Sequence, residues 1–585
     1  MKELKYLHKY FYKYKKSLII GLVITILARL FALVTPKVIG NSVNVINHFL
    51  ENPANNTDVV KQELLNNILL IIGATLVAAL FTFLMRQTFI VVSRRVEFDL
   101  KNEIYNHYQK LSLGFYKLNR IGDLMSRISE DVSKVRMYVG PALMYSVQTL
   151  SLFIVVISYM YSQAPSLTLY AVAPLPVLSF AIYRLSVAIN KRSTVVQQYL
   201  SKLTTFTQES FSGISVIKSY AIESKTNSDF IALAEQSRDK NIELVKVQAL
   251  FFPIMILLIG VSNLMVIFIG GNQYINGTIA ELGTIVEFII FINMLTWPVA
   301  VVGWVTSMVQ QAEASQKRIN EFLNEKPDIV NNIEQPSTIK GKIEFKEVTF
   351  TYPDTNITAL NNVSFRLESG QTLAILGNTG SGKTTILSLI GRLYDVESGQ
   401  ILIDNTPIKQ LNINSLRKAI GYVPQDSFLF SDTIANNIRF GKENASDQEV
   451  AEAAKQAAVH KNIEEFSLKY ETILGERGIS ISGGQKQRIS IARALIKDSQ
   501  IYLFDDSLSA VDTETEEEIL NNLKKLSNEK TTIIVSHRVS TAKIADFIIV
   551  LNQGQIIQQG THSQLINVKG YYQDLYSKQL LEKET

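Results

Sequence analysis

The chain has 585 residues, of which 47% are hydrophobic and 19% are charged, and its mean hydropathy is +0.12. This composition is too apolar for an ordinary soluble protein, and the length allows a membrane region and a soluble domain with separate cores. The formal net charge of +5 is small, and the basic residues flank apolar runs rather than forming one stripe with interleaved aromatic residues, which disfavours nucleic-acid binding. The chain contains no cysteine, which excludes a disulfide framework and a thiolate metal site.

The first sixteen residues predict an amphipathic elbow helix on the membrane surface. Lysines alternate there with leucine, tyrosine and phenylalanine, and an apolar run follows that is long enough to span a bilayer. We expect the lysines to meet lipid headgroups. The side chains expected at the acyl boundary are Leu4, Leu7, Tyr10, Phe11 and Tyr14.

Residues 17–310 predict a transmembrane domain of six helices. Six stretches are apolar enough, and at roughly twenty residues long enough, to cross about 30 Å of hydrocarbon. Lys and Arg crowd the amino terminus and alternate loops, so both termini are expected in the cytoplasm. The expected spans are Ser17–Ile39, Leu65–Val92, Val139–Ser162, Ser166–Ile189, Ala249–Gly271 and Ile279–Ser307.

The segments between these spans predict two different kinds of connection. Residues 93–138 and 190–248 are charged and helix-forming, and they are expected to extend the helices into the cytoplasm. The polar stretch 47–67 is expected to be a modest external loop. A polar linker is expected at 311–340, and a soluble domain at 341–580 that opens with a strand in GKIEFKEVTFTYP.

The soluble domain contains a glycine-rich loop of the kind that binds nucleotide phosphates. The spacing G-x-x-x-x-G-K-[ST] follows the apolar strand 372–376 and precedes a helical run, which is the required context. In such a loop Lys383 reaches the β- and γ-phosphates, and Thr384 supplies an oxygen to Mg²⁺. The residues expected to hold the nucleotide here are Gly377, Asn378, Thr379, Gly380, Ser381, Gly382, Lys383, Thr384 and Thr385.

A second apolar strand, SQIYLFDD, ends in two carboxylates. Asp505 and Asp506 at the end of a buried parallel strand would hold Mg²⁺ and polarise water, and we assign the metal to Asp505. Together with the phosphate loop, this strand indicates hydrolysis of a nucleoside triphosphate.

A second glycine-containing helix start lies between these two motifs. In ISISGGQKQRISIARAL a serine and two glycines open a helix, which makes another anion site. Because one phosphate loop is already present, the second site is more naturally offered to a neighbouring molecule. This stretch closely resembles the signature of the ATP-binding cassette (ABC) family, and the matching residues are Ser482, Gly483, Gly484 and Gln485.

The resemblance extends in order through the whole soluble domain and assigns further roles. In the family Tyr352 would stack on adenine, and Gln425 would couple Mg²⁺ and the attacking water to the membrane domain. Asp512, in SAVD, would lie across a dimer interface, and His537 would contact the γ-phosphate. The implied cofactors are ATP and Mg²⁺, the latter held by Thr384, Gln425 and Asp505.

The membrane half resembles the exporter subgroup of this family. The stretches LSLGFYKLNRIGDLMSRISEDVSKVR and ESFSGISVIKSYAIES are similar to those in which these exporters form short coupling helices against the cassettes. The resemblance therefore implies a half-transporter: an α-helical membrane bundle fused to an α/β P-loop cassette, working as a dimer in the cell (inner) membrane. Its implied activity is ATP-driven export by alternating access.

One position departs from the family pattern. Asp506 stands where the family usually has a catalytic glutamate, and its side chain is one methylene shorter, which predicts slow hydrolysis. The same departure resembles the degenerate subunit of heterodimeric exporters, whereas the retained His537 favours a working site. A heterodimer, a homodimer with two weakened sites, and an ATP-binding regulatory or scaffold subunit therefore all remain open.

Two of the ionisable residues in the membrane segments call for a function. Arg29 and Glu287 lie within expected spans, where a charge is costly, so they are expected either to contact substrate in a central cavity or to pair with each other. The substrate class remains open among an amphipathic drug, a lipid and a hydrophobic peptide.

Overall fold

The structure is a computed structural model that describes all residues except 1, 52–56, 476–480, 510, 528–529 and 585. It consists of two compact units. The first comprises Met1–Gln109 and Gly122–Glu325, and the second comprises Lys110–Ile121 and Lys326–Thr585. The short segment Lys110–Ile121, which contains α5 (Leu113–Leu118), therefore belongs to the unit formed by the carboxyl-terminal half of the chain.

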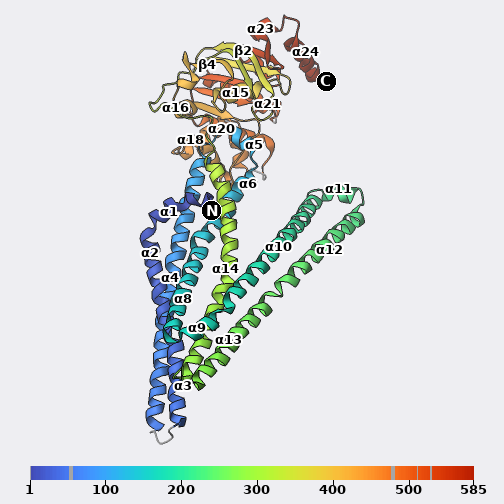
Figure 1. Ribbon diagram of the computed structural model, residues 1–585. Helices are drawn as coiled ribbons and strands as arrows, with labels where there is room; N and C mark the ends of the chain where they lie inside the picture. Colours follow the sequence, from blue (N-terminus) through green and yellow to red (C-terminus); the bar gives the residue numbers. More distant parts are fainter. Residues whose placement is uncertain (1, 52–56, 476–480, 510, 528–529, 585) are drawn as a thin grey trace. The chain divides into compact units, whose positions relative to one another are not determined.

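The first unit is built from long helices, six of which are long and apolar enough to cross a membrane among the residues described. Figure 1 shows them as extended rods, several of them made of consecutive shorter helices. The rods are α2 (Lys15–Ala32) with α3 (Val34–Glu51); α4 (Thr57–Tyr108); α6 (Ile121–Ser126), α7 (Val132–Met137) and α8 (Leu143–Gln163), joined by π-helical turns at Arg127–Asp131 and Tyr138–Ala142; α9 (Pro165–Val172) with α10 (Pro174–Ser212); α12 (Glu223–Gln248) with α13 (Phe251–Ile275); and α14 (Leu282–Leu323).

The predicted spans fall on these rods, but the helices run further than the apolar residues do. Helix continues to Glu51 and resumes at Thr57, so most of the stretch expected as an external loop is helical. Helix α14 likewise begins at Leu282 and continues to Leu323, well past the expected start of the linker. Its cytoplasmic part buries Ala312, Ile319 and Phe322 on one face. The polar residues that predict a loop and a linker instead form the exposed faces of amphipathic helices in water.

The amino-terminal elbow packs on protein, and the expectation that its apolar side chains face the acyl boundary is wrong for three of them. In the 3₁₀-helix Glu3–Leu7 and in α1 (His8–Lys13), Leu4, Leu7 and Tyr10 are buried within the first unit. The Tyr10 hydroxyl donates to Glu103 at 2.5 Å. Carboxylates on α4, which the sequence pattern does not reveal as partners, therefore hold the elbow in place.

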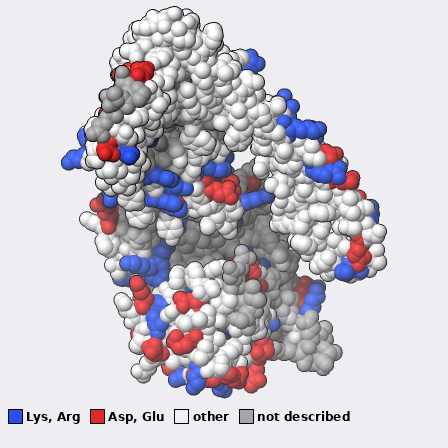
Figure 2. Space-filling model, turned by 90° about the horizontal axis from the view of Figure 1, so that it is seen from below, with Lys and Arg blue, Asp and Glu red and all other residues white. Residues whose placement is uncertain are grey.

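The outer surface of the long helices suits a lipid environment. Large apolar side chains on α4, among them Ile68, Leu69 and Leu76, are more than half exposed. Figure 2 shows broad uncharged surface, with Lys, Arg, Asp and Glu gathered in clusters rather than spread evenly. Exposed apolar surface of this extent is stable when hydrocarbon covers it.

Helices α3 and α14 approach each other through two glycines. A side chain built at Gly283 would place its Cβ 2.1 Å from the carbonyl oxygen of Gly40 and 2.6 Å from the Asn44 Oδ1. The same Asn44 oxygen accepts a hydrogen bond from the Gly283 N–H at 2.6 Å. Small residues at this contact let the two backbones touch, which is a common means of packing helices in membranes.

The second unit is an α/β domain with two sheets. A six-stranded sheet has the order β10-β9-β3-β8-β7-β6, in which all neighbours are parallel except β10 and β9. An antiparallel sheet has the order β2-β1-β4-β5. The strands are β1 (Ile343–Thr351), β2 (Thr358–Leu367), β3 (Thr372–Gly377), β4 (Ser398–Ile403), β5 (Thr406–Pro407), β6 (Ile420–Val423), β7 (Ile501–Asp505), β8 (Thr531–Val535), β9 (Phe547–Asn552) and β10 (Gln555–Gly560).

The helices of this unit surround the sheets and form a separate helical cluster. Strands β3, β7 and β8 are buried along their whole length, as expected for central parallel strands. A second apolar core lies under the helices that follow β6. The helices are α15 (Lys383–Ile390), α16 (Ile413–Lys418), α17 (Ile434–Arg439), α18 (Asp447–Gln456), α19 (His460–Glu464), α20 (Gly483–Leu495), α21 (Thr513–Ser527), α22 (Val539–Lys543), α23 (His562–Leu565) and α24 (Tyr571–Glu584).

We predict that Gly283→Ala lowers the stability of the first unit by about 1–3 kcal/mol, because the added methyl group forces α3 and α14 apart. The measurement is the apparent melting temperature of the purified chain in detergent. Gly260→Ala is the matched control, since a Cβ at Gly260 in α13 meets no atom within 4 Å. Equal melting temperatures for the two variants would contradict the close helix contact.

Candidate functional site

The predicted phosphate loop lies between β3 and α15, as its motif requires. Gly377, Gly380 and Gly382 have φ values of +145°, +79° and +102°, which residues other than glycine rarely adopt. A Cβ at Gly382 would lie 2.3 Å from the carbonyl oxygen of Ala359. The backbone therefore closes tightly around the start of α15, and its N–H groups are available to an anion.

The polar groups within this loop fit a phosphate chain. The Lys383 ammonium donates to the carbonyl oxygens of Gly377 and Asn378, both at 2.8 Å, and so lies inside the loop. Burial lowers the pKa of Lys383, while Asp506 and Asp505 oppose that shift. The Ser381 hydroxyl is buried without a hydrogen-bond partner among the described residues. A phosphate group would supply the acceptor that Ser381 lacks and the negative charge that Lys383 attracts.

Strand β7 brings the expected metal ligand to the same place. The Thr384 hydroxyl donates to the Asp505 Oδ1 at 2.9 Å, and Asp505 is only 2% exposed. Burial raises the pKa of Asp505, the nearby charge of Asp506 raises it further, and the Thr384 hydrogen bond and Lys383 oppose the shift. A hydroxyl and a carboxylate at this spacing are the oxygen ligands that Mg²⁺ takes in nucleotide sites.

Tyr352 lies next to the loop in an aromatic cluster. Its hydroxyl is 3.0 Å from that of Thr385, which is buried and points toward the tyrosine. The rings of Tyr352 and Tyr394 meet edge to face at 5.5 Å. From α5, the Lys117 ammonium lies 4.4 Å from the centre of the Tyr352 ring. Sequence reasoning missed Lys117, because it lies more than two hundred residues from this tyrosine in the chain.

Asp506 and His537 lie near the phosphate loop at the ends of neighbouring strands. Asp506 has a φ of +44°, an unusual backbone conformation for a residue other than glycine, and its N–H donates to the Val535 carbonyl at 3.0 Å. Burial raises the pKa of Asp506, and the charges of His537, Lys383 and Arg538 oppose that shift. Burial lowers the pKa of His537, as does the charge of Lys383.

Gln425 and Asp512 are both exposed. Gln425 follows β6, whose Val423 pairs with Phe504, so the glutamine lies at the same sheet edge as Asp505. Asp512 Oδ1 accepts a hydrogen bond from the Thr515 N–H at 2.9 Å, at the start of α21. Of the expected SAVD segment, Ala510 lies outside the described residues.

The signature residues form a separate helix start. Ser482 caps α20, and its hydroxyl accepts from the Gln485 N–H at 3.3 Å while the Gln485 side chain accepts from the Ser482 N–H at 3.1 Å. A Cβ at Gly483 would meet open space. No hydrogen bond or ion pair joins Ser482–Gln485 to residues 377–385 among the described parts of the chain.

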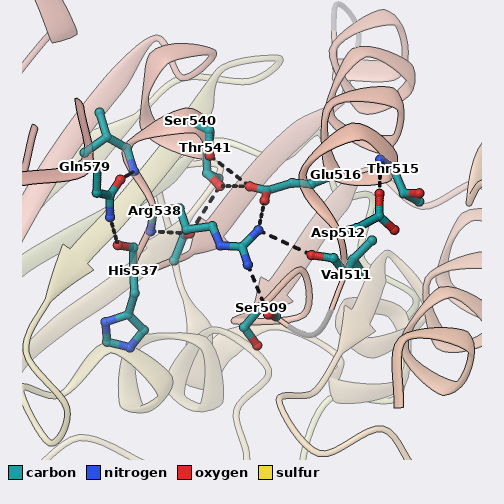
Figure 3. A network of polar contacts seen from close by, with 12 residues as sticks. Ser509, Val511, Asp512, Thr515, Glu516, His537, Arg538, Ser540, Thr541 and Gln579 are labelled. Carbon is teal, nitrogen blue, oxygen red and sulfur yellow. Dashed lines mark hydrogen bonds and ion pairs between the residues drawn. The ribbon is translucent and has the colours of Figure 1, made fainter. Parts of the chain in front are cut away.

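Arg538 joins the histidine-bearing loop to the loop that follows Asp506 (Figure 3). Its guanidinium forms an ion pair with Glu516, whose side chain is 1% exposed, and it donates to the carbonyl oxygens of Ser509 at 3.2 Å and Val511 at 3.4 Å. Gln579 of α24 donates to the His537 carbonyl at 2.9 Å. The sequence pattern predicted neither the Arg538–Glu516 ion pair nor the Gln579–His537 hydrogen bond, because Glu516 and Gln579 lie outside the motifs.

We predict that Arg538→Met destabilises the second unit by roughly 3–5 kcal/mol, because it leaves the buried Glu516 carboxylate without its cation. Thermal unfolding followed by circular dichroism measures the loss. Arg366→Met is the control, since Arg366 pairs with Glu368 on the surface and such pairs contribute about 0–1 kcal/mol. A melting temperature unchanged by Arg538→Met would show that the buried pair contributes little.

Comparisons with known proteins agree with this arrangement. Residues 18–299 match the ABC transporter transmembrane region, and residues 360–509 match the ABC transporter family. The chain is 36% identical to the multidrug resistance-like ATP-binding protein MdlA of Escherichia coli strain K12, covering 95% of this chain and 93% of the relative. It is also 36% identical to an ATP-dependent lipid A-core flippase of Syntrophus aciditrophicus strain SB, covering 84% and 82% of the two chains.

A solved structure gives the same result for the fold. A bacterial Atm1-family ABC exporter with ATP bound covers 97% of this chain, with a TM-score of 0.79 and 26% sequence identity, and 98% of that structure's chain is matched. The membrane helices and the cassette thus agree with one family. The chain belongs to the ABC transporters, as a multi-pass half-transporter of the exporter type whose cytoplasmic cassette binds ATP and couples its hydrolysis to export.

Proposed function

We propose that the chain exports an amphipathic or hydrophobic molecule from the cytoplasm or inner leaflet of the cell membrane, as one half of a dimer that works by alternating access. Names of relatives that refer to multidrug resistance and to a lipid flippase support a drug or a lipid as the substrate. ATP binding closes two cassettes, and hydrolysis reopens them.

The main support for a dimer is that one cassette contains two anion-binding helix amino termini, at α15 and α20, that make no polar contact with each other among the described residues. Loop 377–382 offers its N–H groups at the start of α15, and Ser482 with two glycines offers others at the start of α20. No polar contact joins the two among the described residues, and a Cβ at Gly483 would meet open space. A second cassette placed head to tail would bring its own signature to the nucleotide on this loop.

Helices α10 and α12 give independent support for a partner. They pack along each other as a hairpin closed by α11 (Ile214–Ser219), as Figure 1 shows. Near its tip Phe211 and Tyr220 are 72% and 76% exposed. Large aromatic side chains at the end of a cytoplasmic hairpin favour contact with another protein surface.

We assign the nucleotide contacts as follows. Tyr352 stacks on adenine, the backbone of residues 377–382 surrounds the phosphates, and Lys383 neutralises their charge. Thr384 and Asp505, which already touch, would hold Mg²⁺ with Gln425, and the ion would draw charge from the phosphate oxygens. Thr385 acts through its contact with the Tyr352 hydroxyl. Ser482–Gln485 and Asp512 act on the nucleotide of the partner.

Asp506 is proposed to orient the attacking water, and His537 to contact the γ-phosphate. The strained backbone of Asp506 and its N–H bond to Val535 fix where its short side chain points. A carboxylate about one ångström further from the water than a glutamate costs on the order of a hundredfold in rate. A homodimer with two slow sites, and a heterodimer in which the partner supplies a faster site, both follow from this assignment. A regulatory ATP-binding subunit is the alternative function.

We predict that the purified chain in lipid hydrolyses ATP slowly, that Lys383→Ala abolishes the activity, and that Asp506→Glu raises it about tenfold or more, because the longer carboxylate reaches the water. Phosphate release with Mg²⁺ present measures the rate. A chain that binds ATP yet stays inactive in both the native form and Asp506→Glu would favour the regulatory subunit.

We predict that ATP brings the signature of one copy to the phosphate loop of another. Because the chain has no cysteine, Thr379→Cys with Ser482→Cys introduces two unique thiols. Cross-linking of the double variant should give a covalent dimer that depends on ATP, while either single variant stays monomeric on denaturing gels. Absence of that dimer under ATP-bound conditions would exclude a homodimer of this geometry and indicate a different partner chain.

A further inference from the structure

A cavity of about 220 Å³ lies within the first unit among α2, α8 and α14. These three elements carry parts of the first, third and sixth predicted spans, so the cavity is within the membrane region. Its lining includes Arg29, Tyr145, Gln148, Thr149, Met294 and Trp297.

Among the described residues, Arg29 is the only charged one that lines this cavity. Its Nε is shielded from solvent and has no hydrogen-bond partner among the described residues. Glu287, expected as a possible partner, is 6% exposed and packs against Gly40 of α3, and no ion pair joins it to Arg29 in the part of the chain that the structure describes. An uncompensated cation among apolar helices is costly, and an ionisable residue in a membrane segment is by default a candidate functional site.

The other lining groups suit the polar end of an amphiphile. Tyr145, Gln148 and Thr149 follow one another at helical spacing on α8, so their side chains share one face. They offer a phenol, an amide and a hydroxyl beside the guanidinium. Trp297 and Met294 add apolar and aromatic surface from α14, and the Tyr145 ring packs against Trp304 at 5.3 Å.

We infer that this cavity binds the anionic head of an amphipathic substrate that carries a single negative charge, an inference that rests on the proposed export function and specifies its substrate class. Arg29 pairs with the charge, and Gln148 and Thr149 complete its hydrogen bonds. One guanidinium compensates one anion, so a lipophilic cation is repelled from the cavity.

The size of the cavity limits how much of the ligand it takes. Pockets that enclose a whole drug-sized molecule measure about 300–1,000 Å³. A cavity of about 220 Å³ is smaller, so it holds the head and the adjoining carbons while the tail lies outside. Recognition then depends on the charge of the head more than on the length of the tail.

The chain provides its own optical reporter for this cavity. It contains only two tryptophans, of which Trp297 lines the cavity and Trp304 contacts the Tyr145 ring. Both side chains are also exposed, Trp297 by 66% and Trp304 by 48%, so only the part of the energy transfer to a dansyl group that depends on Arg29 reports a ligand bound here. The probe is dansylated undecanoate, an anion, and the methyl ester of the same molecule is its neutral match. Binding is measured in phosphatidylcholine nanodiscs without nucleotide, in the Lys383→Ala background.

We expect the anionic probe to bind at least about tenfold more tightly than its ester, and Arg29→Gln to remove that preference while leaving ester binding unchanged. Arg29→Lys should retain most of the preference because it keeps the charge. Arg184→Gln is the matched control, since this arginine on α10 does not line the cavity. The dansylated amine of the same chain length should bind more weakly than the ester.

If the chain with Arg29 unchanged bound the anion and the ester equally tightly, that result alone would overturn the inference. So would an unchanged preference in Arg29→Gln. Competition then identifies the source of the head: displacement by phosphatidylglycerol indicates a bilayer lipid, and displacement by decanoate alone indicates a free amphipathic acid. Displacement by neither would also overturn it.

The outcome is distinguishable from failure of the proposed function, because binding is measured without ATP. A chain that hydrolyses ATP and transports a substrate but shows no dependence on Arg29 would retain the exporter assignment and lose this inference. A chain that binds the anion through Arg29 but transports no substrate would retain this inference and lose the exporter assignment.

Discussion

The constraint on which the molecule depends is the lack of hydrogen-bond partners for backbone groups in hydrocarbon. It forces the first half of the chain into long helices, because only helices satisfy their own N–H and carbonyl groups there. The helices need no polar side chains for this purpose, so their outer surface remains apolar and exposed, as on α4. Phosphate chemistry requires polar groups and open N–H donors, and these belong to the second unit, where loop 377–382 presents them beside Lys383.

The cassette is assembled so that its reactive groups come from different strand ends that the parallel sheet brings together. The phosphate loop follows β3, Asp505 ends β7 and Asp506 comes directly after it, and His537 follows β8, which lies between these two strands. Parallel strands align their carboxyl ends at one edge, so the order of strands places the groups before any ligand arrives. Arg538 then reaches across from the histidine loop to Ser509 and Val511, which links the positions of His537 and Asp506.

Two features of the cassette bear on the proposed dimer. Asp506, for which we propose the role of orienting water, has a side chain one methylene shorter than glutamate and a φ of +44°, and the signature at Ser482 makes no polar contact with the phosphate loop of its own cassette among the described residues. The second feature fits the proposed dimer, in which each nucleotide would contact two cassettes. In the membrane, the Nε of Arg29 has no hydrogen-bond partner among the described residues, and the anionic ligand that we infer would supply one.

The sequence by itself determined the six spans, the phosphate loop, the carboxylates of β7 and the family, because apolar length and fixed motif spacing are local properties of the chain. It misjudged the ends of α3, α4 and α14, since polar residues serve equally as loops and as exposed helix faces. Only the tertiary structure decided that Leu4 and Leu7 pack on protein, that Lys117 reaches Tyr352, and that Arg29 does not pair with Glu287. These contacts join residues far apart in the chain. A local sequence pattern does not specify which distant side chains come into contact when the chain packs.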